Sequence, residues 1–161
     1  MIHTLLDTPL DPLLAVGDDA GRLTGLWFDR SPAPESRRDD RAFAPLREQV
    51  DAYFAGDLTA FDVPLLMAGT PWQREVWQAL QAVPYGQTMS YGELAARLGR
   101  PSAARAVGAA NGRNPVSVIV PCHRLIGASG ALTGYLGGLE RKRWLLDHER
   151  SSAALTGAVS K

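Results

Sequence analysis

Short apolar runs alternate with polar turn-forming stretches over the first third of the chain. IHTLL, LLAV and RLTGLWF are separated by DTPLDP and GDDAG. This pattern is typical of antiparallel strands joined by tight turns. We therefore expect an N-terminal domain over residues 1–66 with a three-stranded antiparallel sheet and accompanying helices. The proline- and charge-rich residues 29–41 predict an exposed loop.

The pattern changes to a helical period at residue 70. Thr70 is placed as an N-cap, Pro71 stands at the first helical position, and Gln73 completes a capping box. An apolar stripe with helical spacing follows, formed by Trp72, Val76, Ala79, Leu80 and Val83. These signals predict a helix that begins directly after residue 70.

Two short helices are predicted next. Ser90 and Glu93 form a second capping box, and this helix ends at Gly99. The following helix is expected to begin near Ser102 and to end at residues 111–112. Two short helices joined by a glycine-containing turn are typical of a helix-turn-helix, although an ordinary helical hairpin has the same pattern.

Together these elements predict a mixed α/β (α+β) fold. A mostly helical C-terminal domain is expected over residues 70–150, ending in a helix that contains LERKRWLLDHE. Residues 151–161 are expected to form a flexible tail.

Composition limits the class of protein. Hydrophobic residues make up 45% of the 161-residue chain, which is enough to form a folded core. There is one cysteine, so no internal disulfide can form, and no apolar run approaches the roughly 20 residues needed to span a bilayer. We expect a reduced, cytoplasmic protein without a membrane segment.

The charge is unevenly distributed although the net charge is zero. Residues 1–62 contain 12 acidic and 6 basic side chains, whereas residues 63–161 contain 5 and 11. Between Leu94 and Leu139 there are five arginines and no acidic residue. An asymmetry of this kind indicates an anionic partner and favours a nucleic-acid-binding helix-turn-helix over a plain hairpin.

The single cysteine lies in this acid-free segment. Cys122 follows the apolar run VSVIV, which predicts a buried strand, and it precedes His123. A buried inert thiol is the ordinary interpretation of one cysteine. An adjacent imidazole could instead act as the base of a reactive thiol. Neighbours on a strand point to opposite faces, so this role requires a turn at Cys122 or a bridging water.

These motifs resemble those of one enzyme family. VPCHR, preceded by ARAVGAANGRNP and followed by GALTGYLGGLERKRWLLDHE, is similar to the O6-alkylguanine-DNA alkyltransferases. The resemblance is strong from about residue 70 to residue 149 and looser over the N-terminal domain. It implies repair of DNA by transfer of an alkyl group from guanine O6 to the protein's own cysteine, once per molecule.

The resemblance implies catalytic roles for five residues. Cys122 would accept the alkyl group. His123 would remove the thiol proton through a water, and Glu149 would orient the histidine. Asn114 would brace the turn before the active site. Tyr91 would donate a proton toward N3 of the extruded guanine.

It also implies a partner and a pocket. Double-stranded DNA would be bound through its minor groove without sequence preference, by a monomer or by molecules clustered along the duplex. Arg105 would fill the space left by the flipped base, and further DNA contacts would come from Ala106, Ala109, Gly112, Arg113 and Arg124. Tyr135 would line the pocket, where backbone near Cys122, Leu125 and Leu136 would read the base edge.

One position departs from the family pattern. Leu136 stands where the family usually has a small residue, so its side chain either narrows the pocket or points outward. No cofactor is implied, and one cysteine with three histidines indicates no metal site.

Two alternatives have different consequences. A DNA-binding regulatory module with a structural cysteine would bind DNA without any change in cysteine mass. A cysteine hydrolase using Cys122, His123 and Glu149 would lack an evident oxyanion turn, and it would leave the acid-free segment unexplained.

Overall fold

The computed structural model describes residues 1–156, with side chains described through residue 154. The chain forms two compact units. The first contains residues 1–68 together with 115–117, and the second contains residues 69–114 together with the chain from Val118 onward.

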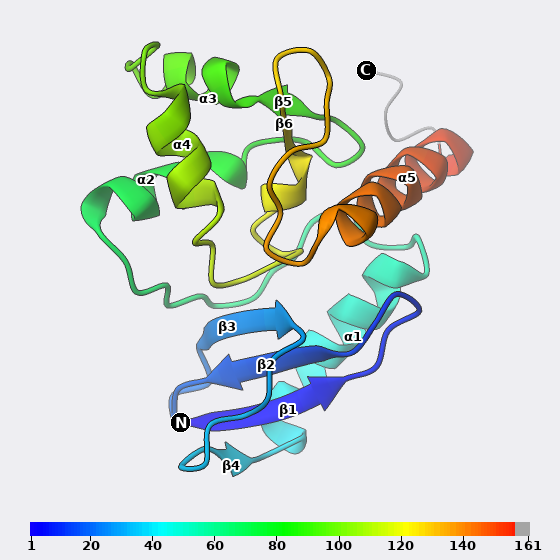
Figure 1. Ribbon diagram of the computed structural model, residues 1–161. Helices are drawn as coiled ribbons and strands as arrows, with labels where there is room; N and C mark the ends of the chain where they lie inside the picture. Colours follow the sequence, from blue (N-terminus) through cyan, green and yellow to red (C-terminus); the bar gives the residue numbers. More distant parts are fainter. Residues whose placement is uncertain (157–161) are drawn as a thin grey trace. The chain divides into compact units, whose positions relative to one another are not determined.

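A four-stranded sheet organises the first unit (Figure 1). Strands β1 (Ile2–Leu6), β2 (Leu13–Gly17) and β3 (Leu23–Phe28) are antiparallel, as the alternating pattern predicts. The sheet has four strands instead of the three expected, because β4 (Arg37–Arg38) pairs parallel to β1. The strand order is β3-β2-β1-β4.

Strand β4 lies within residues 29–41, which the sequence predicted to be an exposed loop. Hydrogen bonds at and beside β4 hold it against β1: the Arg37 amide donates to the Met1 carbonyl at 3.2 Å, the Asp39 amide donates to the His3 carbonyl at 2.9 Å, and the side chain of Thr4 donates to Asp40 at 2.6 Å. Both residues of β4 are exposed and basic. It therefore carries no apolar alternation from which a strand could be predicted.

The core of the first unit forms between the sheet and helix α1 (Ala44–Phe54), which follows a 3-10 turn at Arg41–Phe43 (Figure 1). The buried residues of α1 recur with helical spacing: Leu46, Val50, Tyr53 and Phe54. Sheet residues such as Leu6, Leu13 and Leu26 are buried as well.

Helices dominate the second unit, which confirms the mixed α/β prediction. The three helices of its first half are α2 (Pro71–Leu80), α3 (Tyr91–Arg97) and α4 (Ala104–Asn111). Both predicted capping boxes are present, at Thr70 and at Ser90. A two-stranded parallel pair, β5 (Met89–Ser90) and β6 (Leu125–Ile126), adds a small sheet.

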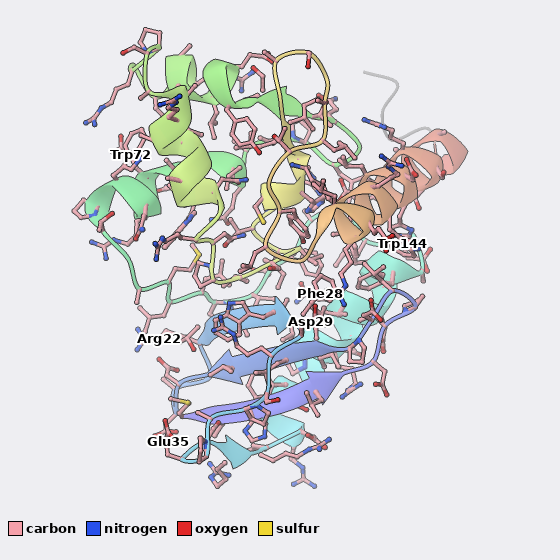
Figure 2. All side chains as sticks on the ribbon, viewed as in Figure 1. Arg22, Phe28, Asp29, Glu35, Trp72 and Trp144 are labelled. Carbon is pink, nitrogen blue, oxygen red and sulfur yellow. The ribbon has the colours of Figure 1, made fainter. Side chains whose placement is uncertain are left out.

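Two tryptophans of α2 hold α4 in place. The indole nitrogen of Trp72, which is labelled in Figure 2, donates to the Ala106 carbonyl at 3.1 Å. The indole nitrogen of Trp77 donates to the Ala110 carbonyl at 2.8 Å. The two acceptors are one helical turn apart, so both bonds fall on the same side of α4. Arg105 and Ala109 of α4 remain exposed, while Gly108 approaches Tyr91 of α3.

The predicted strand before Cys122 is wrong. Residues 115–120 form turns with a single bridge at Val116, and Val118 has a φ of 72°. This left-handed conformation is strained for a β-branched residue, at a cost of about 1–3 kcal/mol. The apolar run is buried as expected, but the chain reverses direction through it instead of extending.

The C-terminal helix is longer than predicted. Helix α5 spans Leu139–Thr156, and Ala153 is buried, so residues 151–156 continue the helix instead of beginning a flexible tail. Residues 157–161, the rest of the expected tail, lie outside the described residues. Within residues 1–156, none of the helices combines the length and hydropathy required to cross a membrane.

The cap of α3 gives a first test. Ser90 accepts a bond from the Glu93 amide at 3.0 Å and positions Tyr91, the first residue of the helix. The Ser90→Ala variant is expected to lower the free energy of unfolding by about 1 kcal/mol, measured by urea denaturation. Ser102→Ala, in an exposed turn, is the matched control. An equal effect of both changes would contradict the capping role.

Candidate active site

Cys122 begins a short 3-10 turn over Cys122–Arg124. All three residues of the turn are buried, and the cysteine is 3% exposed. The chain therefore turns where a strand was predicted, which removes the geometric objection to cooperation between Cys122 and His123.

The imidazole of His123 is bonded to a carboxylate from the other end of the unit. Its Nε2 lies 2.7 Å from Oε2 of Glu149 on α5, and both side chains are fully buried. The carboxylate accepts the hydrogen on Nε2, so Nδ1 carries the lone pair. Nδ1 is buried and has no hydrogen-bond partner among the described residues.

The site is uncharged at the thiol and at the base. Burial raises the pKa of Cys122 to about 11, so the sulfur is a thiol at neutral pH. Burial lowers the pKa of His123, which keeps the imidazole neutral. Burial alone would raise the pKa of Glu149, but contacts with His123 and Arg124 outweigh it and hold that pKa well below its usual range.

Two asparagines connect the end of α4 to the cysteine turn. Asn114 donates to the Val120 carbonyl at 2.7 Å, and its side chain acts to lower the pKa of Cys122 against the larger effect of burial. Asn111 donates to the Cys122 carbonyl at 3.3 Å. The position of the thiol is therefore tied to the position of α4.

A buried lysine closes the other side of the site. Lys142 of α5 donates from Nζ to the Leu125 carbonyl at 2.5 Å and to the Thr133 carbonyl at 2.7 Å. Burial lowers its pKa to about 8, while the nearby Cys122 acts in the opposite direction. The lysine joins β6 to the loop that carries Tyr135 and Leu136.

The expected pocket residues lie around this loop. The Tyr91 hydroxyl donates to the Thr133 carbonyl at 3.3 Å and accepts from the Thr133 hydroxyl at 3.2 Å. Leu125 is buried and Tyr135 is half-buried. Leu136 is 61% exposed, so its side chain points outward, the second of the two orientations considered from the sequence.

Five of the expected DNA-binding residues share one face of the α4 region. They have the spacing of neighbours on a helix surface, and all are exposed: Arg105, Ala106, Ala109, Gly112 and Arg113. The face therefore presents two arginines with small residues between them. Helix α3 packs behind α4, where Gly108 approaches the ring of Tyr91.

The assignment of Arg124 to DNA contact is wrong. Arg124 is 7% exposed, and its guanidinium bonds to Glu149 and to the Val83 carbonyl. Its position in the acid-free segment suggested a free cation. Its acidic partner, Glu149, lies 25 residues further along the chain on α5, so the composition of the segment around Arg124 could not reveal it.

Lys142 and Asn111 were missed as site residues. A signal for the lysine was present, because Lys142, Leu145, Leu146 and Glu149 have the spacing of one helical face, and all four are buried. Asn111 had no comparable signal, since an asparagine at a helix end is usually explained by the cap.

The geometry defines a class of protein: a helix-turn-helix domain built around a buried thiol with a neutral base. Residues 71–151 match the family model described as the 6-O-methylguanine DNA methyltransferase DNA binding domain, and residues 1–67 match its ribonuclease-like domain. The chain belongs to the 6-O-methylguanine DNA methyltransferase family.

Individual relatives agree with this membership. Proteins named methylated-DNA–protein-cysteine methyltransferase are 51% identical in Mycolicibacterium paratuberculosis, covering 96% of both chains, and 48% identical in Salmonella typhimurium, covering 92% of this chain and 95% of the relative. A crystal structure of Mycobacterium tuberculosis OGT in complex with DNA has a TM-score of 0.89 at 50% identity and covers 94% of each chain.

The buried ammonium of Lys142 predicts a pH effect on stability. Its pKa is about 8 in the folded protein and 10.5 without burial, so between these values the unfolded chain holds a proton that the folded chain has released. The contribution of Lys142 to the free energy of unfolding therefore rises with pH over that range. The protein with Lys142 should gain stability relative to Lys142→Met as pH increases from 7.5 to 9.5, measured by urea denaturation.

Both proteins in this comparison should carry Cys122→Ser, so that titration of the thiol does not enter. A stability difference that stays constant with pH would contradict the lowered pKa of Lys142.

Proposed function

We propose that this protein repairs DNA by moving an alkyl group from O6 of guanine to the sulfur of Cys122. The observation that carries the proposal is the buried Cys122–His123–Glu149 arrangement, linked through Asn111 and Asn114 to helix α4, on which Arg105 is exposed. Family membership supports it, as do the names of the relatives and the DNA complex of the Mycobacterium tuberculosis protein.

The first chemical step is removal of the thiol proton. His123 is neutral, and its Nε2–H is held by Glu149, so Nδ1 is the atom that accepts the proton, through a bridging water. The resulting imidazolium lies beside an ionised carboxylate, which stabilises it. The thiolate then exists only while the base holds its proton, which limits side reactions of the sulfur.

Alkyl transfer follows as a displacement at carbon. A bond forms between Sγ of Cys122 and the alkyl carbon while the bond from that carbon to guanine O6 breaks. The electron pair remains on the guanine, which takes up a proton at N3 from the Tyr91 hydroxyl. The product is a thioether without an easily displaced group, so each molecule reacts once and is consumed.

The alkylated base has to leave the duplex before this chemistry can occur. Flipping costs a few kcal/mol, which pocket contacts and an inserted side chain offset. On the exposed face of α4, small residues allow close approach to the minor groove, and Arg105 is placed to enter the base stack. Contacts between arginines and phosphates are independent of sequence, which suits a repair protein.

The need for a free thiol at Cys122 also limits the cellular compartment in which the protein can act. The reaction requires Cys122 as a free thiol, and the chain has no second cysteine with which to form an internal disulfide. A reducing compartment meets this requirement, and we place the activity in the cytoplasm.

Mass spectrometry tests the acceptor. A duplex containing one O6-methylguanine is mixed with the protein, and one added methyl group is expected on the peptide that contains Cys122, with guanine restored in the DNA. Cys122→Ser should abolish transfer and keep affinity for undamaged duplex. Methylation of any other residue, or transfer by the serine variant, would contradict the assignment.

The role of Arg105 is tested by comparing two substrates. Arg105→Ala should slow repair of duplex O6-methylguanine at least tenfold, with a much smaller effect on reaction with the free base, which needs no flipping. Arg143→Ala, an exposed arginine on α5, is the control and should change neither rate. Equal loss on both substrates would remove Arg105 from base extrusion.

A further inference from the structure

Arg124 makes an unusually complete set of contacts for a residue next to the proposed base. Its Nε donates to Oε1 of Glu149 at 2.8 Å, and its Nη2 donates to Oε2 at 3.0 Å. Its Nη1 donates to the Val83 carbonyl at 2.7 Å, and the guanidinium lies 5.7 Å from the centre of the Tyr85 ring. Each terminal nitrogen therefore has a fixed partner.

The Glu149 carboxylate is correspondingly surrounded by donors. Oε1 accepts from Arg124 and, at 3.3 Å, from the Gly86 amide, while Oε2 accepts from His123 and Arg124. A bidentate pair of this geometry fixes the plane of the carboxylate as well as its position. The direction in which Oε2 faces His123 therefore depends on the guanidinium.

We propose that Arg124 is a positioning residue for alkyl transfer, which fixes the Glu149 carboxylate against His123 and balances its charge so that the imidazole stays unprotonated and able to accept the thiol proton. The proposal rests on the proposed function, because it takes His123 as the base. It does not depend on how DNA is bound.

The charges that face His123 support this role. Glu149 favours the imidazolium form, whereas Arg124 from its own turn and Lys142 from α5 oppose it, and burial opposes it most strongly. Cys122 lies beside it as a neutral thiol, and Tyr85 faces the other side of the ion pair. Without Arg124, an unbalanced buried carboxylate would remain next to the imidazole and would draw a proton onto it.

A purely structural role makes a different prediction. Loss of packing or of the buried ion pair would lower stability and would slow transfer by the same factor at every pH. Loss of charge balance would act through His123 and would slow transfer most in acid. The two roles are therefore separated by the pH dependence.

The first measurement is the protonation state of His123. The chain has three histidines, so their ring signals can be followed individually by nuclear magnetic resonance as pH is lowered. In the wild type, His123 is expected to remain neutral at pH 6. In Arg124→Met its midpoint should move upward by at least one pH unit, while His3 and His148 are unchanged. An unmoved midpoint would overturn the proposal.

The second measurement is the rate of methyl transfer at saturating protein from a duplex containing O6-methylguanine. The deficit of Arg124→Met relative to wild type should be larger at pH 6 than at pH 8.5, by about twofold if the His123 midpoint of the variant lies at pH 6 and by about tenfold if it lies at pH 7, because only unprotonated His123 accepts the thiol proton. Arg124→Lys keeps the charge and should keep the wild-type pH profile at a reduced rate. A deficit that is equal at all pH values would overturn the proposal.

Two further variants complete the test. Arg143→Met makes the same change at an exposed position of α5 and should leave the rate and the profile unchanged. If Arg124→Met does not fold, Arg124→Met combined with Glu149→Gln replaces the ion pair by a neutral pair, which proteins often tolerate. In this double variant His123 should again be neutral at pH 6, and its protonation there would overturn the proposal.

Failure of the proposed function has a different signature. A wild-type protein that transfers no methyl group would remove the alkyltransferase assignment, whereas an unmoved His123 midpoint in an active protein would remove only the role of Arg124.

Discussion

The buried carboxylate of Glu149 is the constraint on which the arrangement of the second unit depends. Removing an ion from water costs several kcal/mol unless its partners compensate, and Glu149 has no exposed surface. Its donors come from two separate parts of the chain, the cysteine turn and the loop after α2, whereas the carboxylate itself is on α5. Satisfying this one group therefore brings the cysteine turn, the loop after α2 and α5 together.

The same network keeps the site inactive until substrate arrives. The thiol is protonated, the base is neutral and the sulfur is almost fully buried. An exposed thiolate would react with any available electrophile, and a protein that is consumed by one reaction would be lost to such side reactions. Burial thus protects the acceptor, and an alkylated base that enters the pocket meets the thiol and its base already in place.

Hydrogen bonds connect the end of α4, the second helix of the helix-turn-helix, to the turn that carries Cys122. Asn111 and Asn114 bond to carbonyls on either side of Pro121, and the chain between them reverses through the strained Val118. Strain of this kind persists only where surrounding contacts over-determine the backbone. The position of α4 is therefore coupled to the backbone at Cys122.

Local signals determined much of this structure from the sequence. The caps at Thr70 and Ser90, the antiparallel strands and the helical stripes depend on neighbours a few residues apart, so they could be predicted without knowledge of the fold. The motif around Cys122 indicated the chemistry through its resemblance to an enzyme family. Only the tertiary structure showed that Arg124 is buried in an ion pair with Glu149 instead of being available for DNA contact. Glu149 is distant in sequence, and a charged side chain can be buried only where such a partner is present. The tertiary structure also brought Lys142 close to the thiol. It decided as well that residues 115–120 form turns instead of a strand, since the direction of a buried segment is set by the residues that pack around it.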